Sequence, residues 1–209
     1  MKVLLVNGSP HANGCTFTAL SEVEKTLHAN GIGTDWYQLG KAPVQGCVAC
    51  RGCKTTGRCV VSADANDVAE RIRAADGVVV GSPVYFASAN GALCALLDRV
   101  FFSASKTFRG KPAASVVSCR RGGASAAFDR LNKYFTLAEM PVTSSQYWNS
   151  VHGNSPEEVL RDAEGLQVMR TLGHNMAWLL NSFSAAKAAG LPAPEREERV
   201  ATNFIRKEK

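Results

Sequence analysis

The segment from Lys2 to Thr18, K-V-L-L-V-N-G-S-P-H-A-N-G-C-T-F-T, decides the fold, because in it an apolar strand runs directly into a polar loop. Its residues 3–6 form a continuous apolar run, which is typical of a strand covered by helices on both faces of a parallel sheet. Apolar side chains then recur at helical spacing at Phe17, Leu20, Val23 and Leu27. The loop therefore leads from a strand onto the N-terminus of a helix.

A helix N-terminus attracts anions through its unpaired N–H groups and its dipole. The loop has neither the G-x-G-x-x-G pattern of dinucleotide sites nor a P-loop, because Cys15 stands where a P-loop has its Lys. It offers hydroxyl and amide groups instead, on Asn7, Ser9, Asn13, Thr16 and Thr18. Such groups without a cation predict a site for a single phosphate. The alternative is an ordinary polar turn between a strand and a helix.

Length and composition limit the classes of protein to consider. A chain of 209 residues with 45% hydrophobic content is expected to form one α/β domain over residues 1–209. The net charge is +6, but Lys and Arg are scattered and much of the charge lies in a tail from about residue 191, so we expect no nucleic-acid partner. No stretch approaches the roughly 18 apolar residues of a membrane span, and the N-terminal apolar run is too short for a signal peptide. We therefore expect a cytoplasmic protein without a membrane partner.

Strand and helix patterns alternate five times along the chain. Further strands are expected at 34–39, 78–80, 113–118 and 140–143. Asp64 and Asp67 are candidate caps of the helix before the third strand, and Ser155-Pro156-Glu157-Glu158 is a capping box that begins the last helical region. In that region Gly165 and Gly173 are candidate breaks. The alternation predicts an α/β fold with a doubly wound, five-stranded parallel sheet of order 2-1-3-4-5 and helices on both faces.

Ligands of such sheets bind at the carboxyl ends of the strands, where three loops are expected to meet. The first is the candidate phosphate loop, the second contains Pro83 to Phe86, and the third runs from Cys119 to Gly123. Together they suit a mononucleotide with a large planar ring. The alternatives are core packing for Tyr85 and Phe86, and a solvated face for the two arginines of the third loop.

The same three segments resemble the flavodoxin-like NADPH-dependent FMN reductase family, and the resemblance covers most of the chain. N-G-S-P-H-A-N-G-C-T, G-S-P-V-Y-F and the Gly122-Gly123 loop stand where that family holds FMN. The resemblance implies a phosphate site formed by Ser9, Asn13, Thr16 and Phe17, a flavin-edge site formed by Pro83, Val84, Tyr85 and Phe86, and contacts on the other side of the ring from Arg120, Arg121, Gly122 and Gly123.

Other residues near these segments have open roles. His11 stands where the family often has Arg or Lys. Cys15 and Cys119 are either plain thiols or, if they lie at the flavin, groups that sense its redox state. Tyr147, Trp148 and His152 either cover the flavin from a neighbouring loop or subunit, or pack at a sheet edge or dimer contact. Arg120 and Arg121, if functional, would bind the 2′-phosphate of NADPH or the reduced ring.

A loop at about 41–62 contains Cys47, Cys50, Cys53 and Cys59 in the pattern C-x-x-C-x-x-C-x₅-C. This spacing is close to a bacterial iron–sulfur run and differs mainly in its last interval, whereas structural zinc sites join two cysteine pairs across a longer gap. The open alternatives are an iron–sulfur cluster, free or redox-active thiols, and zinc. The loop also resembles that of the iron-sulfur flavoprotein branch of the family, in which four cysteines ligate a [4Fe–4S] cluster next to FMN.

The resemblance implies an FMN-dependent oxidoreductase in which NAD(P)H reduces FMN and the electrons pass to a quinone, a nitro or azo compound, free flavin or a protein acceptor. Because the flavin carries the chemistry, no catalytic side chain is expected. One alternative is an electron carrier in which a [4Fe–4S] cluster links a ferredoxin-like donor to FMN. Another is a non-catalytic flavin- or metal-binding regulatory module. The family further suggests a homodimer or homotetramer.

Overall fold

Strand β1 (Lys2–Asn7) lies inside a parallel sheet of order β2-β1-β3-β5-β6. The computed structural model describes residues 1–198, 200, 202 and 204. The other parallel strands are β2 (Gly33–Gln38), β3 (Gly77–Tyr85), β5 (Ala113–Cys119) and β6 (Ser150–His152). The predicted order 2-1-3-4-5 is therefore confirmed for the parallel strands. The sixth strand, β4 (Ser88–Ala89), pairs antiparallel with β3 outside this order.

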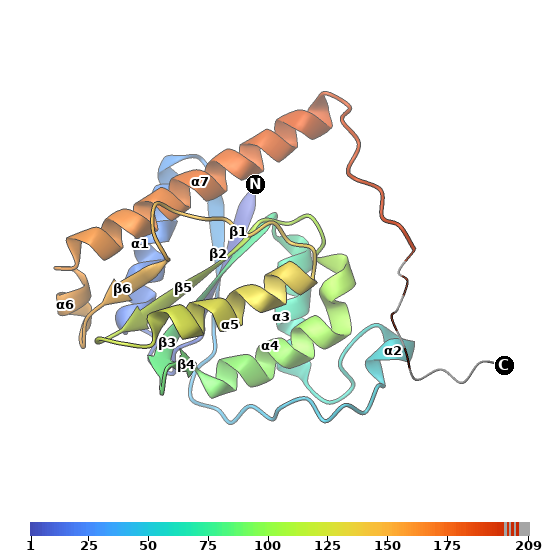
Figure 1. Cartoon of the computed structure of the whole chain (residues 1–209), viewed down its shortest axis with the longest axis horizontal. Coiled ribbons are helices and arrows are strands. Elements are labelled where there is room, and N and C mark those ends of the chain that lie inside the picture. The colour runs from blue at the N-terminus through green and yellow to red at the C-terminus, as the bar shows by residue number, and fades with distance from the viewer. Residues whose placement is uncertain (199, 201, 203, 205–209) are drawn as a thin grey trace.

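Two helical layers cover the sheet (Figure 1). Helices α1 (Cys15–Ala29) and α7 (Ala163–Ala188) pack on one face, and α3 (Ala63–Ala74), α4 (Gly91–Ala104) and α5 (Ala124–Leu137) pack on the other. In β1, Val3 and Leu5 belong to the first core and Leu4 and Val6 to the second. Because successive strand residues point to opposite faces, a strand covered on both sides must be apolar throughout, which explains the continuous run of residues 3–6.

The last strand differs from the prediction of a strand at 140–143. Only Val142 forms a bridge there, with Ala113, and the regular strand begins at Ser150. The backbone of Ala113 exchanges hydrogen bonds with Pro141 and Thr143, and β6 then pairs with Val117–Cys119. Pro141 has no N–H group to extend the first contact, so the chain leaves β5 and returns to it further on.

Two predictions about helix ends were wrong. Ser62 caps α3 by accepting the N–H of Ala65, so Asp64 lies inside the helix and is not its cap. Helix α7 is continuous through Gly165 and Gly173. A Cβ atom at Gly173 would lie 2.7 Å from the Cβ of Thr26, so this glycine allows α7 to approach α1 closely. The predicted cap at Ser155 is confirmed for α6 (Pro156–Val159), where the Ser155 hydroxyl accepts the N–H of Glu158.

The predicted cysteine loop contains the short helix α2 (Cys53–Thr56), and η1 (Ser105–Thr107) follows α4. Residues 191–198, the first part of the predicted charged tail, form no helix or strand, and residues 199, 201, 203 and 205–209 lie outside the described part. Within the described residues, no helix is both long and apolar enough to cross a membrane.

Candidate functional site

The first loop is fixed by backbone contacts to its neighbours. The N–H of Gly8 donates to the carbonyl of Gly81 in β3 at 2.8 Å, and the Nδ2 of Asn90 donates to the carbonyl of Gly8 at 2.8 Å. A Cβ atom at Gly8 would lie 2.4 Å from a methyl carbon of Leu93 and 2.6 Å from the oxygen of Gly81. Position 8 therefore has room only for glycine. Together with the two hydrogen bonds, this close packing fixes the direction in which the loop leaves β1.

Asn7 shapes this loop from inside. Its fully buried side chain donates through Nδ2 to the Oε1 of Gln38 at 2.6 Å, and its Oδ1 accepts the N–H of Ser9 at 3.2 Å. Gln38 in turn donates to the carbonyl of Ser9 at 2.6 Å. The predicted role of the Asn7 amide as a phosphate donor was therefore wrong, because its hydrogen-bonding groups already bind the protein.

The three hydroxyl groups of the loop also have internal partners. Ser9 Oγ accepts the N–H of His11 at 3.1 Å, Thr16 Oγ1 pairs with Ser118 Oγ at 2.9 Å, and Thr18 Oγ1 donates to the carbonyl of Gly14 at 3.2 Å. Ser9 acts as acceptor in its bond and so keeps its hydroxyl hydrogen for a ligand, whereas in the Thr16–Ser118 pair either hydroxyl can be the donor. The buried pair of Thr16 and Ser118 ties the start of α1 to the end of β5.

The N-terminus of α1 remains available to an anion. Gly14 occupies the cap position and has no side chain to cap the helix, and no side-chain hydrogen bond to the first turn is present in the described part of the chain. His11 and Asn13 are exposed beside it, and Phe17 packs against Trp36 with ring centroids 5.1 Å apart. An anion bound here would therefore be held mainly by backbone N–H groups and the helix dipole, with Ser9 and Asn13 beside it.

The segment Pro83 to Phe86 is the end of a hairpin, where a loop was predicted. Strand β3 continues to Tyr85 and turns through Phe86 and Ala87, which both have positive φ (49° and 58°), into β4. The side chains of Tyr85 and Phe86 are exposed, so the core-packing alternative was wrong. Two non-glycine residues in the left-handed region cost roughly 1–2 kcal/mol each, and such strain is most common at functional sites.

The third loop packs directly under this hairpin. Gly123 has φ = 91°, and a Cβ atom there would lie 2.6 Å from the Cα of Ala87. Cys119 is buried at the end of β5, and its carbonyl accepts the N–H of Gly153 at 3.1 Å. Arg120, Arg121 and Gly122 are exposed. The carboxyl ends of β1, β3 and β5 therefore bring all three predicted loops to one edge of the sheet.

Strand β6 ends at this edge with His152, which pairs with Cys119. Tyr147 and Trp148 precede β6 and so lie before this edge; they are exposed and pack on each other with centroids 5.1 Å apart. The backbone N–H of His152 donates to Asp162 at 2.6 Å, and the half-exposed imidazole lies with Nδ1 3.7 Å from the same carboxylate. Cys15 lies 3.8 Å from the carbonyl of Gly153, and burial raises the pKa of both the Cys15 and the Cys119 thiol. Both thiols are therefore neutral near pH 7.

Sequence patterns did not identify three residues that shape this edge: Gln38, Asn90 and Ser118. They lie at the end of β2, after β4 and in β5, where polar residues are common, and their contacts span many residues of chain. The one available signal for Ser118 in the sequence was that it is a polar residue in the mostly apolar segment 113–118.

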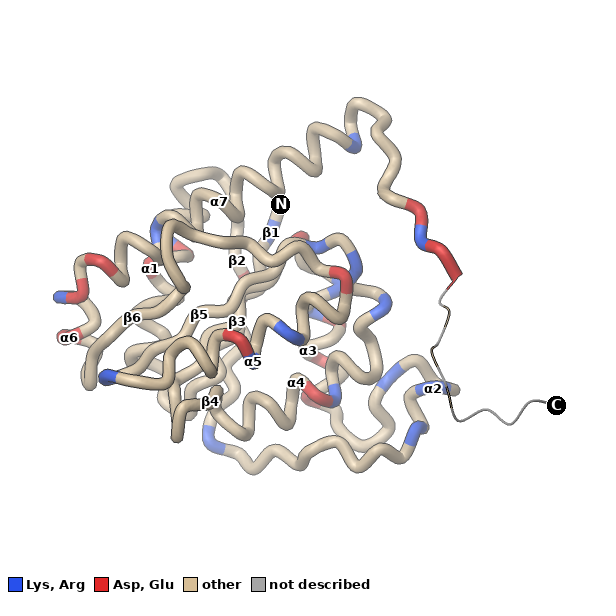
Figure 2. The backbone as a smooth tube through the Cα atoms, viewed as in Figure 1, with Lys and Arg blue, Asp and Glu red and all other residues tan. Residues whose placement is uncertain are grey.

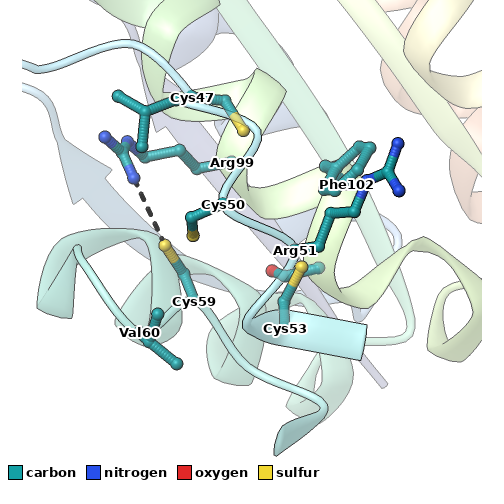
Figure 3. Close-up of a pocket in the computed structure, with 10 residues that line it drawn as sticks. Cys47, Cys50, Arg51, Cys53, Cys59, Val60, Arg99 and Phe102 are labelled. Carbon is teal, nitrogen blue, oxygen red and sulfur yellow. Dashed lines mark hydrogen bonds between the residues drawn. The ribbon is translucent and has the colours of Figure 1, made fainter. Parts of the chain in front are cut away.

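A second candidate site lies in the cysteine loop. Cys47, Cys50, Cys53 and Cys59 line one pocket together with Arg99 and Phe102 of α4 (Figure 3). All seven cysteines of the chain are free thiols. Ala49 and Arg51, on either side of Cys50, have positive φ (52° and 60°). Arg51 is followed by Gly52 in right-handed conformation (φ −55°, ψ −31°), and an alternation of left- and right-handed residues is the backbone pattern of anion-binding nests.

Arg99 was not predicted as part of this site. Its Nη1 donates to the sulfur of Cys59 at 3.4 Å, as the dashed line in Figure 3 shows. Burial alone would raise the pKa of Cys59, but hydrogen bonds from the backbone of Val61, from Arg99 and from the backbone of Ser62 outweigh it and lower that pKa. In the sequence, Arg99 comes shortly after the apolar residues Leu96 and Leu97 of α4, and nothing there points to the cysteine loop. Its role becomes apparent only from its burial in the structure.

The four thiols fit an iron–sulfur group in kind and number, and they line one pocket. As placed, the described residues contain no group of three or more Cys, His, Asp or Glu side chains positioned to hold a metal ion. The sheet-edge site fits a flavin mononucleotide through its uncapped helix, its exposed aromatic hairpin and the close packing at Gly8 and Gly123.

Comparison with known proteins bears on the family and the fold. The family model described as NADPH-dependent FMN reductase matches residues 1–155. Two iron-sulfur flavoproteins of Methanocaldococcus jannaschii are similar to the chain: one is 28% identical over 85% of this chain and 96% of its own length, and the other is 30% identical over 81% and 92%. A flavodoxin from an archaeon has the same fold, with a TM-score of 0.59 and 14% identity over 87% of this chain and 99% of that one.

Proposed function

Because the chain belongs to the NADPH-dependent FMN reductase family, we propose that it is an FMN-dependent oxidoreductase that receives single electrons through an iron–sulfur cluster in its cysteine loop. The observation that carries the cluster is that Cys47, Cys50, Cys53 and Cys59 line the same pocket. Two similar relatives are themselves named iron-sulfur flavoproteins. When bound, FMN would supply both one- and two-electron chemistry.

The sheet edge would hold FMN through residues of three loops. The first turn of α1 and the Ser9 hydroxyl would bind the phosphate, because this helix start has no side-chain cap of its own. The hairpin at Tyr85 and Phe86 would lie against the flavin ring of FMN. The exposed backbone near Gly122 would contact the other side of that ring. Asn7 would hold the loop in place without touching the phosphate, and the Thr16–Ser118 pair would tie the start of α1 to β5.

The surface of the cysteine loop supports a protein as the electron donor. Residues 36–63 contain Lys41, Arg51, Lys54 and Arg58 but no Asp or Glu, and all four cations are exposed. Figure 2 shows basic and no acidic positions on the segment that carries α2. None of these four residues takes part in an ion pair within the described part of the chain. Such a surface attracts an acidic partner protein, such as a ferredoxin-like donor.

A second candidate function is direct reduction of FMN by NADPH. The description of the matching family model favours it, and Arg120 and Arg121 are exposed at the sheet edge, where they are free to bind a 2′-phosphate. In this case the four thiols would serve another purpose. The acceptors would be the small molecules that suit an open flavin face: quinones, nitro or azo compounds and free flavin.

Anaerobic rapid mixing distinguishes the two functions. Purified protein with bound FMN is mixed either with NADPH or with a reduced, acidic ferredoxin, and the loss of flavin absorbance is followed. We expect fast reduction by ferredoxin and slow reduction by NADPH. Fast reduction by NADPH, unchanged when Cys47 and Cys50 are both replaced by Ser, would instead support the second function.

A further inference from the structure

We infer that Arg99 is the positioning residue of the cysteine loop: it closes the loop on α4 and supplies the positive charge that faces the pocket. This inference rests on the proposed function, because the anionic group that needs such a charge is a cluster with its thiolates. It adds Arg99 to the four cysteines as a residue on which this site depends.

Arg99 is a buried cation. Only 3% of its surface is exposed, in the second half of α4. Moving a guanidinium group out of water costs several kcal/mol unless hydrogen bonds and an opposite charge compensate. The hydrogen bonds are present: Nε donates to the carbonyl of Gln45 and Nη2 to the carbonyl of Gly46, both at 2.6 Å. These two acceptors are neutral, so they satisfy the donors without balancing the charge.

No carboxylate pairs with Arg99 in the described part of the chain. Its neighbour Asp98 is directed elsewhere and accepts hydrogen bonds from Tyr134 and Arg130. The remaining contact of Arg99 is the sulfur of Cys59 at 3.4 Å, on the wall of the pocket with the four thiols. Within the described residues this buried guanidinium has no carboxylate partner, and its acceptor besides the two carbonyls is a pocket sulfur, so a negatively charged group held in the pocket would balance its charge.

The three contacts of Arg99 also close the loop. Gln45 and Gly46 precede the first cysteine, and Cys59 is the last, so one planar guanidinium joins both ends of the cysteine segment. A hydrogen bond to a ligand sulfur, together with a nearby positive charge, makes reduction of an iron–sulfur cluster easier. Arg99 is therefore expected to affect two measurable properties: the order of the loop and the reduction potential.

The test uses Arg99→Met, which removes the charge and the donors, and Arg99→Lys, which keeps the charge but not the planar fork. Arg130→Met is the matched control, because it removes one positive charge from the neighbouring helix α5 without a contact to the loop. Each full-length protein is purified anaerobically and assayed for iron, sulfide and the cluster reduction potential. Metal-free samples are digested with trypsin, which cleaves after Arg51, Lys54 and Arg58 in the loop.

In Arg99→Met we expect loop cleavage to be at least about tenfold faster, as for the loss of one hydrogen bond to a charged group. We also expect less iron per chain and a lower reduction potential in the cluster that remains. Arg99→Lys should restore the potential toward that of the parent protein while its loop stays easily cleaved. Arg130→Met should match the parent in every assay. FMN titration, which reports on the distant sheet edge, confirms that each variant is folded.

Parent-like loop cleavage and a parent-like potential in Arg99→Met would overturn the inference. If Arg99→Met does not fold, loop cleavage in Arg99→Lys decides: parent-like cleavage in that variant overturns the inference, and faster cleavage supports it. If the parent protein itself takes up no iron, the proposed cluster is wrong. The trypsin assay on metal-free protein then still decides whether Arg99 closes the loop.

Discussion

At the scale of single residues, Gly8 shows how close packing determines the site. We predict that Gly8→Ala destabilises the protein by about 1–3 kcal/mol, because the added Cβ would meet Leu93 and the backbone of Gly81 within 2.6 Å. FMN should bind more weakly, since the displaced loop carries the anion site. Urea unfolding and a fluorescence titration with FMN measure the two effects.

Gly91→Ala is the matched control, because among the described residues no atom beyond its chain neighbours and the backbone of its own helix lies within 4 Å of a Cβ atom added there, and the residue begins α4 beside the same loop. It should leave FMN affinity unchanged and stability equal or up to about 1 kcal/mol higher. Equal stability losses in both variants would show that the close contact at Gly8 has no special role.

The thiols give a residue-level prediction about pH. In metal-free protein the lowered pKa of Cys59 means that its thiolate persists to lower pH, whereas burial raises the pKa of Cys119 and keeps that thiol neutral to higher pH. Alkylation by iodoacetamide should therefore begin below the usual thiol pKa of about 8.5 at Cys59 and above it at Cys119. Mass spectrometry of peptides from samples alkylated across a pH series gives both midpoints. A midpoint for Cys119 below that of Cys59 would contradict the hydrogen-bonding and burial pattern described.

At the scale of elements, the β3–β4 hairpin combines backbone strain with an exposed ring. We predict that Phe86→Ala weakens FMN binding without destabilising the protein, because the Phe86 ring is fully exposed and packs on no core residue. Ala87→Gly should stabilise the protein by up to about 1 kcal/mol, since glycine adopts positive φ without a Cβ penalty. Thermal unfolding with and without FMN measures both effects. A large loss of stability in ligand-free Phe86→Ala would assign the ring to packing.

How far sequence patterns predicted each element depends on the range of the interactions that form it. Strand β1, the start of α1 and the strand order follow from local periodicity and from the rule of right-handed crossovers. The hairpin at Phe86 and the interruption between Val142 and Ser150 depend on pairing with β3 and β5, which no local pattern reports. Likewise, the sequence shows that Thr16 is a polar residue of the first loop. Its partner Ser118 lies 102 residues further along the chain, so no local pattern reports their hydrogen bond.

At the scale of the whole molecule, the two candidate sites lie on different parts of α4. Asn90 caps the helix beside the first loop, and Arg99 contacts the cysteine loop nine residues later, roughly 13 Å along the axis. One rigid helix therefore connects both sites. Their separation allows each to be altered without the other, which the variants described above exploit.

The distribution of charge gives a prediction about the electron donor. We expect Arg51→Gln/Lys54→Gln/Arg58→Gln to lower the rate constant for reduction by an acidic ferredoxin at least about tenfold at low ionic strength. The difference between the rate constants of the parent protein and this variant should shrink as the ionic strength rises to about 0.15 M, where the Debye length falls to about 8 Å. Stopped-flow absorbance measures both. Lys25→Gln/Lys133→Gln/Lys187→Gln removes the same charge from α1, α5 and α7 and should behave as the parent protein. Equal effects of the two triple variants would show that only net charge matters.

The central claim is that one chain holds FMN at the sheet edge and an iron–sulfur cluster in the cysteine loop. The most direct test is to assay anaerobically purified protein for flavin, iron and acid-labile sulfide per chain, together with its absorption spectrum. The account predicts one FMN with about four iron and four sulfide per chain, and broad absorbance beyond the flavin bands. Flavin bands alone, with no iron and with all four loop cysteines open to alkylation, would contradict it.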